Sequence, residues 1–222
     1  TVLSGLGRFG PMAIHGFALM VHAVNTVLLM HTCRALRWPA LAGLVYGLHP
    51  LMSEALGWAS SLPDLLACGF GLGAVLAVRR SAVAGLVFVI AAGLSKESGL
   101  LIPVFVGVAG LAGRRWWIPT AVGIVAVGAL RAGLGVHQSW AWIEKVDLIP
   151  QALGWSLASL VWPFPLNAVR SVWVTPALAI PVAGLLVWVL VYVGRTNRPA
   201  LGGVGLLLCA PVMALPIMLD GY

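Results

Sequence analysis

The sequence predicts an all-α, polytopic integral membrane protein, because its composition is too apolar for a soluble domain. Among 222 residues, 61% are hydrophobic and 9% are charged, and the mean hydropathy is +1.02. A soluble domain typically carries about 25% charged residues. Apolar runs recur along the whole chain, and they lack the alternation of apolar and polar residues that marks the strands of a membrane β-barrel. Lipid is therefore expected to surround most of the chain.

Six apolar runs in the first 134 residues are each expected to form a transmembrane helix. They cover residues 11–33, 40–51, 65–78, 81–94, 99–113 and 118–134. A helix needs about 20 apolar residues to cross a bilayer, so the second run is short. It ends in a polar, proline-bounded stretch, residues 48–64, which we expect to form a loop between two spans.

The last third of the chain is expected to add two further spans and one shorter helix. The apolar run 151–162 is too short to cross a bilayer before Pro163, and its tryptophans suit the membrane interface. Residues 176–193 and 200–219 are long enough to span. The predicted whole is about eight transmembrane helices plus one interfacial or re-entrant helix, in a single transmembrane domain over residues 1–222.

The first run contains three polar residues, His15, His22 and Asn25. Their spacings of seven and three residues place them on one face of a helix. Polar groups that face lipid are costly, so this face is expected to point into the protein. We interpret the three residues as an interhelical hydrogen-bond seam.

Clusters of arginine predict which loops share one side of the membrane. They are Arg34 with Arg37, Arg79 with Arg80, Arg114 with Arg115, and Arg195 with Arg198. Alternating spans place all of them on the side that the positive-inside rule makes cytoplasmic. The acids then all lie outside, namely Glu54, Asp64, Glu97, Glu144, Asp147 and Asp220. We interpret the outer face as a working face, although loops outside a bilayer also carry charges that have no function.

The tip between the fourth and fifth runs is expected to lie below the outer surface. The residues between Arg80 and Arg114 must supply two helices, so each reaches about 25 Å, which is less than the hydrocarbon core of about 30 Å. Lys96 and Glu97 at this tip would be partly desolvated, which membranes tolerate where such groups face a cavity or a partner. The tip is thus a candidate site, and the alternative is a self-neutralising pair in a short hairpin.

Composition and motifs exclude several classes of function. The arginine clusters that set topology account for the formal net charge of +7, so no nucleic-acid partner is expected. Cys33, Cys68 and Cys209 lie singly in apolar runs with no metal or redox spacing, and we interpret them as small packing residues. No motif of soluble enzymes is present. The glycines of residues 69–73 have spacings that let helices approach closely.

Carboxylates with cations beside them, on an outer membrane face, fit group transfer from a lipid phosphate. A carboxylate can act as general base on an acceptor hydroxyl. A lysine or arginine can hold the phosphate leaving group. Acids can also bind a divalent metal, but the sequence shows no dedicated ligand spacing, so no cofactor follows with certainty.

One ordered series of motifs covers most of the chain. It comprises HAVNTVLL at residues 22–29, HP at 49–50, EALGW at 54–58, PDLLA at 63–67, SKESG at 95–99 with Pro103, and WPFPLN at 162–167. The series resembles the membrane half of the transmembrane-and-tetratricopeptide O-mannosyltransferases and related bacterial proteins of the GT-C glycosyltransferase superfamily. The resemblance implies a polyprenyl-phosphate-linked sugar as donor and transfer at the outer or lumenal face with inversion. It implies substrate-binding roles for His49, Glu54, Asp64, Lys96 and Glu97.

The chain departs from that family at several positions. The family's main catalytic acid lies in a first outer loop behind an additional first helix, and we expect the present sequence to lack both. Met52 stands where the family has a histidine, and Leu62-Pro63 stands where it has Gly-Arg. The arginine-tyrosine motif that the family carries beyond the last span is expected to be either cut off or replaced by Asp220-Gly221-Tyr222, and no helical repeats are expected.

Three functions therefore stay open at the level of sequence. The first is a glycosyltransferase that uses a polyprenyl-phosphate sugar in the bacterial inner (cytoplasmic) membrane, with its acidic loops outside. The second is a non-catalytic subunit, derived from the same scaffold and packed against other membrane subunits. The third is a transporter, since broken helices can mark transport sites, but the sequence shows no inverted repeat.

Overall fold

The computed structural model describes residues 10–35, 39–50, 52–108 and 116–134, together with the single positions Trp188, Tyr192 and Arg195. Within these residues all regular structure is helical, and the described ranges contain no strand. The chain divides into two compact units, Thr1–Val104 with Arg115–Val127, and Phe105–Arg114 with Gly128–Tyr222. The fold and the site described below belong to the first unit.

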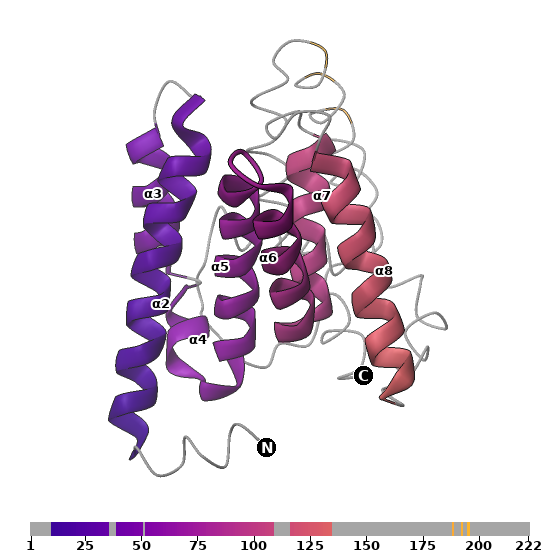
Figure 1. The fold of residues 1–222 in the computed structure, drawn as a ribbon. Helices are drawn as coiled ribbons and strands as arrows, with labels where there is room; N and C mark the ends of the chain where they lie inside the picture. The colour runs from indigo at the N-terminus through magenta and orange to yellow at the C-terminus, as the bar shows by residue number, and fades with distance from the viewer. Residues whose placement is uncertain are drawn as a thin grey trace. The chain divides into compact units, whose positions relative to one another are not determined.

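The helices follow the predicted runs closely (Figure 1). In chain order they are α2 (Gly10–Thr32), η2 (Cys33–Ala35), α3 (Pro39–Leu48), α4 (Met52–Gly57), η3 (Ala59–Ser61), α5 (Leu62–Ala77), α6 (Ala82–Ser95), η4 (Glu97–Leu100), α7 (Leu101–Val108) and α8 (Trp117–Gly133), where η marks a 3-10 helix. The predicted helices 151–162, 176–193 and 200–219 lie outside the described residues, apart from Trp188 and Tyr192, which are helical and stack with ring centroids 5.4 Å apart.

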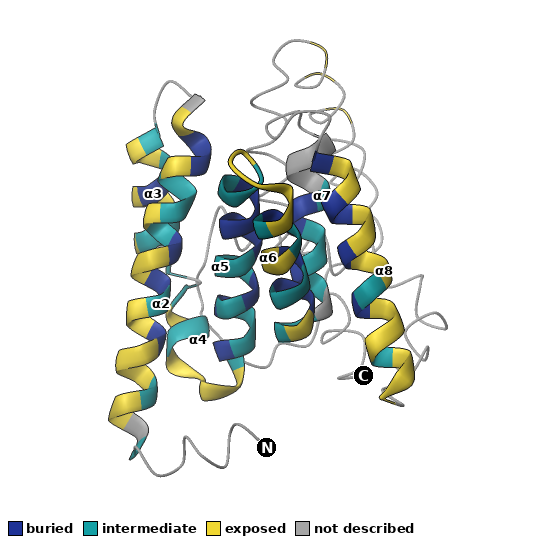
Figure 2. Ribbon diagram, viewed as in Figure 1, coloured by how far each residue is buried: buried dark blue, intermediate teal, exposed yellow. Residues whose placement is uncertain are grey.

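Two of these segments are long and apolar enough to cross a membrane, Met12–Thr32 and Ala59–Ala77. The other apolar helices of the described part, α3, α6 and α8, have 10, 14 and 17 residues. In the most apolar 18-residue stretch of Met12–Thr32, only 17% is buried. In the corresponding stretch of Ala59–Ala77, which contains most of α5, 44% is buried (Figure 2). Length and composition thus support membrane association of the all-helical fold.

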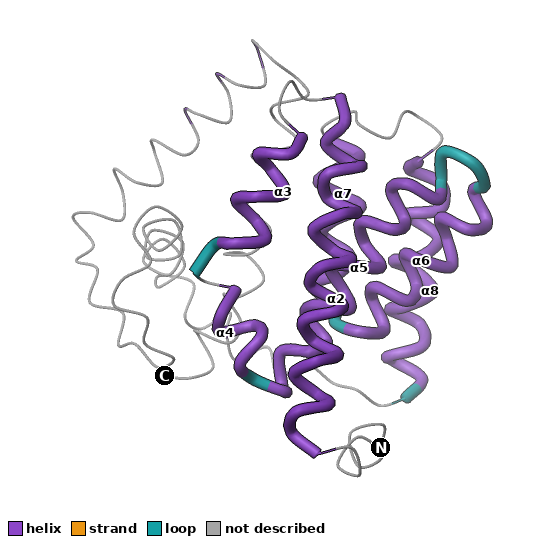
Figure 3. Tube along the Cα trace, turned by 90° about the vertical axis from the view of Figure 1, so that its left-hand side faces the viewer, coloured by secondary structure: helices purple, strands orange, loops and turns teal. Residues whose placement is uncertain are grey.

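The predicted loop at residues 48–64 is instead largely helical. α3 ends at Leu48, and after His49 and Pro50 the chain forms α4 and then η3 (Figure 3). The break follows from Pro50, because a residue that precedes proline is pushed out of the α region. The Met52 amide donates to the His49 carbonyl at 2.9 Å and begins the new helix. α3 therefore covers most of the second predicted span, and the stretch that was predicted to be a loop contains the separate helix α4.

Close glycine contacts pack α5 against its neighbours. A methyl group at Gly69 would lie 2.5 Å from Asn25 Oδ1 of α2, one at Gly71 would lie 2.9 Å from Ile102, and one at Gly73 would lie 3.0 Å from the Phe88 ring of α6. The distances at Gly69 and Gly71 are shorter than real methyl contacts, and the distance at Gly73 is tighter than most of them. The prediction that glycines 69–73 let helices approach closely is confirmed.

The first unit has a basic end and an acidic end. The basic end carries the exposed Arg34, Arg79 and Arg80, where α2 and α5 finish (Figure 1). The acidic end carries Asp64, where α5 starts, and Lys96, where α6 has finished. The helices therefore alternate in direction as the arginine clusters predicted, which puts the candidate site at the end opposite the arginines.

Candidate functional site

The start of α5 holds Asp64 in its first turn. Pro63 lies at the first or second helical position, where its fixed φ suits a helix and its missing N–H is not needed. A carboxylate in the first turn also lies near the positive end of the helix dipole. Local sequence thus fixes where α5 begins and places Asp64 in its first turn.

Lys96 lies at the point where α6 ends and the chain turns into η4. Its backbone is extended, with φ −158° and ψ 139°, while its amide still donates to the Ala92 carbonyl at 3.0 Å. Gly99 closes the turn by donating its amide to the Lys96 carbonyl at 2.9 Å. A side chain at Gly99 would lie 2.7 Å from the Ala92 oxygen and 2.9 Å from the Ala67 methyl group. Only a glycine lets the tip approach α5 and α6 so closely.

This geometry brings Asp64 and Lys96 into contact. The Lys96 ammonium lies 2.5 Å from Asp64 Oδ1, and the two side chains are 23% and 35% exposed respectively. The predicted partial burial of the tip is therefore confirmed for Lys96. Its ion-pair partner comes from α5, across the helix packing, while the side chain of its predicted partner Glu97 lies outside the described residues.

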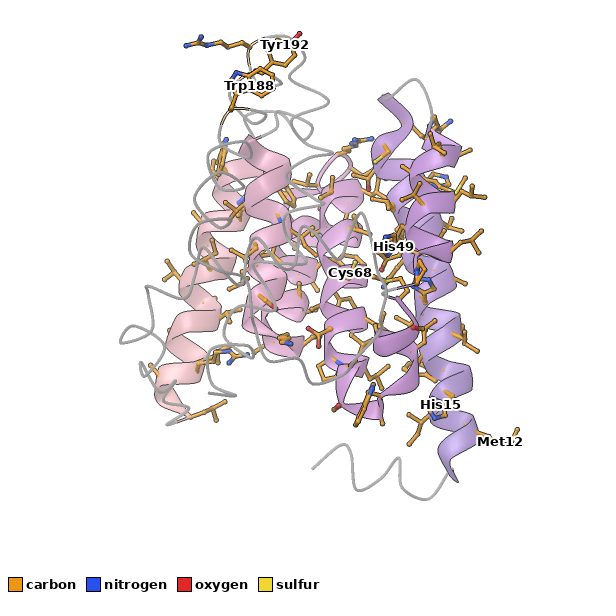
Figure 4. All side chains as sticks on the ribbon, turned by 180° about the vertical axis from the view of Figure 1, so that it is seen from behind. Met12, His15, His49, Cys68, Trp188 and Tyr192 are labelled. Carbon is orange, nitrogen blue, oxygen red and sulfur yellow. The ribbon has the colours of Figure 1, made fainter. Side chains whose placement is uncertain are left out.

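The remaining predicted site residues are only partly placed. His49 lies half-buried in the break after α3, and Figure 4 shows it level with Cys68, at mid-height of the first unit. Glu54 lies on α4 and Glu97 begins η4, with both side chains outside the described residues. The structure thus joins two of the five candidates, Asp64 and Lys96.

The pair offers a compact set of donors and acceptors. Lys96 has three N–H groups, of which Asp64 Oδ1 occupies one direction, and an ammonium can hold a phosphate as a point charge. The Ser98 hydroxyl, two residues on, has a buried oxygen without a hydrogen-bond partner. Lys96 therefore keeps N–H donors that can bind an anionic oxygen, while the carboxylate of Asp64 holds the ammonium in place.

The predicted polar seam on α2 is confirmed. His15 donates from Nδ1 to the Leu56 carbonyl of α4 at 3.0 Å, and His22 donates from Nε2 to the Gly47 carbonyl of α3 at 3.2 Å. Asn25 donates from Nδ2 to the Leu65 carbonyl of α5 at 2.8 Å. One face of α2 thus binds three different helices.

Sequence reasoning missed two residues that complete this seam. The Tyr46 ring of α3 lies against His22, tilted by 33° with ring centroids 5.0 Å apart, and its hydroxyl lies 3.5 Å from the Cys68 sulfur of α5. Cys68 was interpreted as a packing residue, although it also has this polar contact. The signal was a tyrosine inside the apolar run 40–51, where its hydroxyl needs a partner.

Among the described residues, no group of three or more histidine, cysteine, aspartate or glutamate side chains could hold a metal ion. No protein-family model, curated protein or solved structure matches the chain.

Proposed function

We propose that the protein is a GT-C-like, multi-pass membrane protein that transfers a sugar from a polyprenyl-phosphate donor at the outer membrane face. The observation that carries the proposal is the partly buried Asp64–Lys96 pair. It lies at the end of the first unit opposite Arg34, Arg79 and Arg80, which the positive-inside rule assigns to the cytoplasm. The bacterial cytoplasmic membrane is the compartment that this orientation fits.

The apolar surface supports the membrane part of the proposal. Large apolar side chains are exposed along α2 and α8, for example Leu19 at 55%, Met20 at 55%, Ile118 at 72% and Val125 at 70%. Exposed apolar surface of this kind is costly in water at about 25 cal/mol per Å². Acyl chains would cover it and would also accommodate the lipid tail of the donor.

In the proposed reaction an acceptor hydroxyl attacks the first carbon of the sugar and loses its proton to water, and the bond from that carbon to the phosphate oxygen breaks. The phosphate leaves with one more negative charge than it had in the donor. Lys96 is proposed to hold this oxygen, because charge that develops in a poorly hydrated site is stabilised strongly by a fixed cation. Asp64 is proposed to position the ammonium and to share it with the donor.

The test is a transfer assay on the full chain in liposomes that contain a polyprenyl-phosphate sugar. Lys96→Ala is expected to lower turnover by about 100-fold, as loss of one charge-stabilising donor does elsewhere, and Lys96→Arg is expected to retain part of it. Arg79→Ala is the matched control, because it removes one exposed cation at the basic end. Equal turnover in Lys96→Ala and the wild type, with both correctly folded, would refute the proposal.

A second function is favoured by the same ion pair. Asp64 neutralises Lys96 within the chain, as expected of a scaffold that has kept the tip as a packing element. In that case the chain is a non-catalytic subunit of a membrane complex. It would then co-purify with stoichiometric membrane partners in mild detergent and show no transfer with any polyprenyl-phosphate sugar.

A further inference from the structure

The basic end of the first unit carries positive charge that no described acid balances. Arg34, Arg79 and Arg80 are all exposed, and none of them forms an ion pair with a described residue. The acids of the described elements lie in α4, at the start of α5 and in η4, which belong to the opposite end of the unit (Figure 1). The basic end is therefore an uncompensated positive patch.

Helix packing brings Arg34 to the level of the other two arginines. Asn25 of α2 donates to the Leu65 carbonyl of α5, and its Oδ1 is the atom nearest to a methyl group placed at Gly69. α2 and α5 run in the same direction (Figure 1), and each residue advances both helices equally. The nine residues from Asn25 to Arg34 thus reach the last turn of α5, so that three guanidinium groups from two segments share one level.

A hydrogen-bonded turn holds Arg79 and Arg80 between α5 and α6. The amides of Arg80 and Ser81 both donate to the Ala77 carbonyl at 2.9 Å. The Ser81 hydroxyl then accepts from the Ala84 amide at 3.3 Å and caps α6. Because the backbone of the turn is already ordered, its arginines lose less conformational freedom when they bind a ligand.

The indole of Trp117 lies at the same level as the turn. Gly123 of α8 packs against Val89 of α6, and both helices run away from the basic end (Figure 1). Six residues earlier in each helix, Trp117 is therefore level with Val83, close to the start of α6. Trp117 is 43% exposed, and tryptophan favours the boundary between membrane and water.

Exposed apolar side chains begin directly at this level. They are Val83 at 70% and Val87 at 59% on α6, and Ile118 at 72% and Val122 at 48% on α8. Residues four apart share a helix face, so each helix presents an apolar stripe that starts near the arginines. A soluble anion would contact the arginines but would leave these stripes exposed to water, which is costly. A ligand that carries both an anion and an apolar tail fits the whole surface.

We propose that the basic end of the first unit binds an anionic phospholipid. Arg79 and Arg80 donate to the phosphate, since a guanidinium can make two parallel hydrogen bonds to a phosphate, and Arg34 adds a third positive charge. The acyl chains lie along the stripes of α6 and α8. Basic sites between transmembrane helices recognise anionic headgroups in this way. The proposal rests on the proposed membrane location of the chain and is independent of sugar transfer.

The test is thermal unfolding of the full chain in detergent micelles with added lipid. A lipid that binds the folded chain raises the unfolding midpoint, and the rise with lipid concentration gives its affinity. We expect tighter binding of phosphatidylglycerol than of phosphatidylcholine with the same acyl chains. Each basic residue contributes about fivefold in affinity, so Arg79→Gln combined with Arg80→Gln should weaken phosphatidylglycerol binding about 25-fold. Equal affinity of the wild type for both lipids, or unchanged affinity in the double variant, would overturn the proposal.

Three controls locate the site and identify its ligand. Lys96→Ala removes a cation at the acidic end and should keep phosphatidylglycerol binding while it loses sugar transfer, so the two proposals fail separately. Arg79→Lys with Arg80→Lys keeps both charges and should retain most of the affinity. Glycerol phosphate, which lacks acyl chains, should not raise the midpoint, and a rise equal to that of the lipid would refute lipid binding. If the glutamine variant does not fold, added salt decides, because it should weaken the preference for phosphatidylglycerol in the wild type; a preference that salt leaves unchanged would refute the role of the arginines.

Discussion

Replacement of Gly99 by alanine tests the packing that presents Lys96. A methyl group at this position would lie 2.7 Å from the Ala92 carbonyl oxygen, 3.0 Å from its carbon and 2.9 Å from the Ala67 methyl group. Two of these atoms belong to the backbone of α6 and the third is the short side chain of a buried residue. None can move aside by rotation of a side chain, so η4 itself must move.

The magnitude follows from two opposing effects. Overpacking of a filled interior costs about 1–3 kcal/mol, and backbone obstruction favours the upper limit of about 3 kcal/mol. Alanine also reduces the conformational entropy of the unfolded chain, which stabilises the folded state by about 0.4–1 kcal/mol. We therefore expect Gly99→Ala to lower the free energy of unfolding by about 2 kcal/mol, and to loosen the contact between Lys96 and Asp64.

The assay is reversible unfolding of the full chain in detergent micelles, with two comparison variants. Gly16→Ala in α2 has nothing within 4 Å of the added methyl group, so it should be stabilised by up to about 1 kcal/mol through helix propensity. Ala67→Gly removes one obstacle but itself costs about 1 kcal/mol in helix propensity, so the double variant is compared with Ala67→Gly alone, against which the added cost of Gly99→Ala should be smaller. Equal stability of Gly99→Ala and Gly16→Ala would refute the reasoning.

Three smaller predictions concern the same unit. Trp116→Phe removes a buried indole that donates to the Pro103 carbonyl at 2.6 Å, so it should lower the free energy of unfolding by about 2 kcal/mol. Trp117 is exposed, so Trp117→Phe should change that free energy by no more than about 0.5 kcal/mol in the same assay. Ser81→Ala removes the cap that accepts from the Ala84 amide at 3.3 Å and should cost about 1 kcal/mol; no measurable change would mean that the cap is unimportant. Cys33 in η2 is buried, so its maleimide labelling at pH 7 should be slow when the chain is folded and fast when it is unfolded, and equal rates would contradict its burial.

The helices and the seam could be predicted because both depend on local periodicity. His15, His22 and Asn25 share a face at any tertiary arrangement, and their polarity requires partners in an apolar chain. The alternation of the basic and acidic ends followed from the arginine clusters for the same reason. Such features need only the helix repeat and the cost of burying polar groups.

The pairing of the site residues could not be predicted, because it depends on tertiary packing. Lys96 was expected beside its neighbour Glu97, but the extended backbone at Lys96 and the close approach of Gly99 direct its ammonium to Asp64. The contact between Tyr46 and Cys68 likewise joins two helices. In residues 48–64, polar composition suggested a loop, while packing against α2 supports α4 there.

The central claim is that the basic and acidic ends lie on opposite sides of a membrane. Single cysteines at Ser60→Cys and Ala82→Cys, both at exposed positions, test it in a chain whose native cysteines are replaced. In intact bacterial cells an impermeant maleimide should label Ser60→Cys, and should label Ala82→Cys only after the membrane is opened. Labelling of both positions from the same side would contradict the orientation and, with it, the placement of the Asp64–Lys96 site at the outer face.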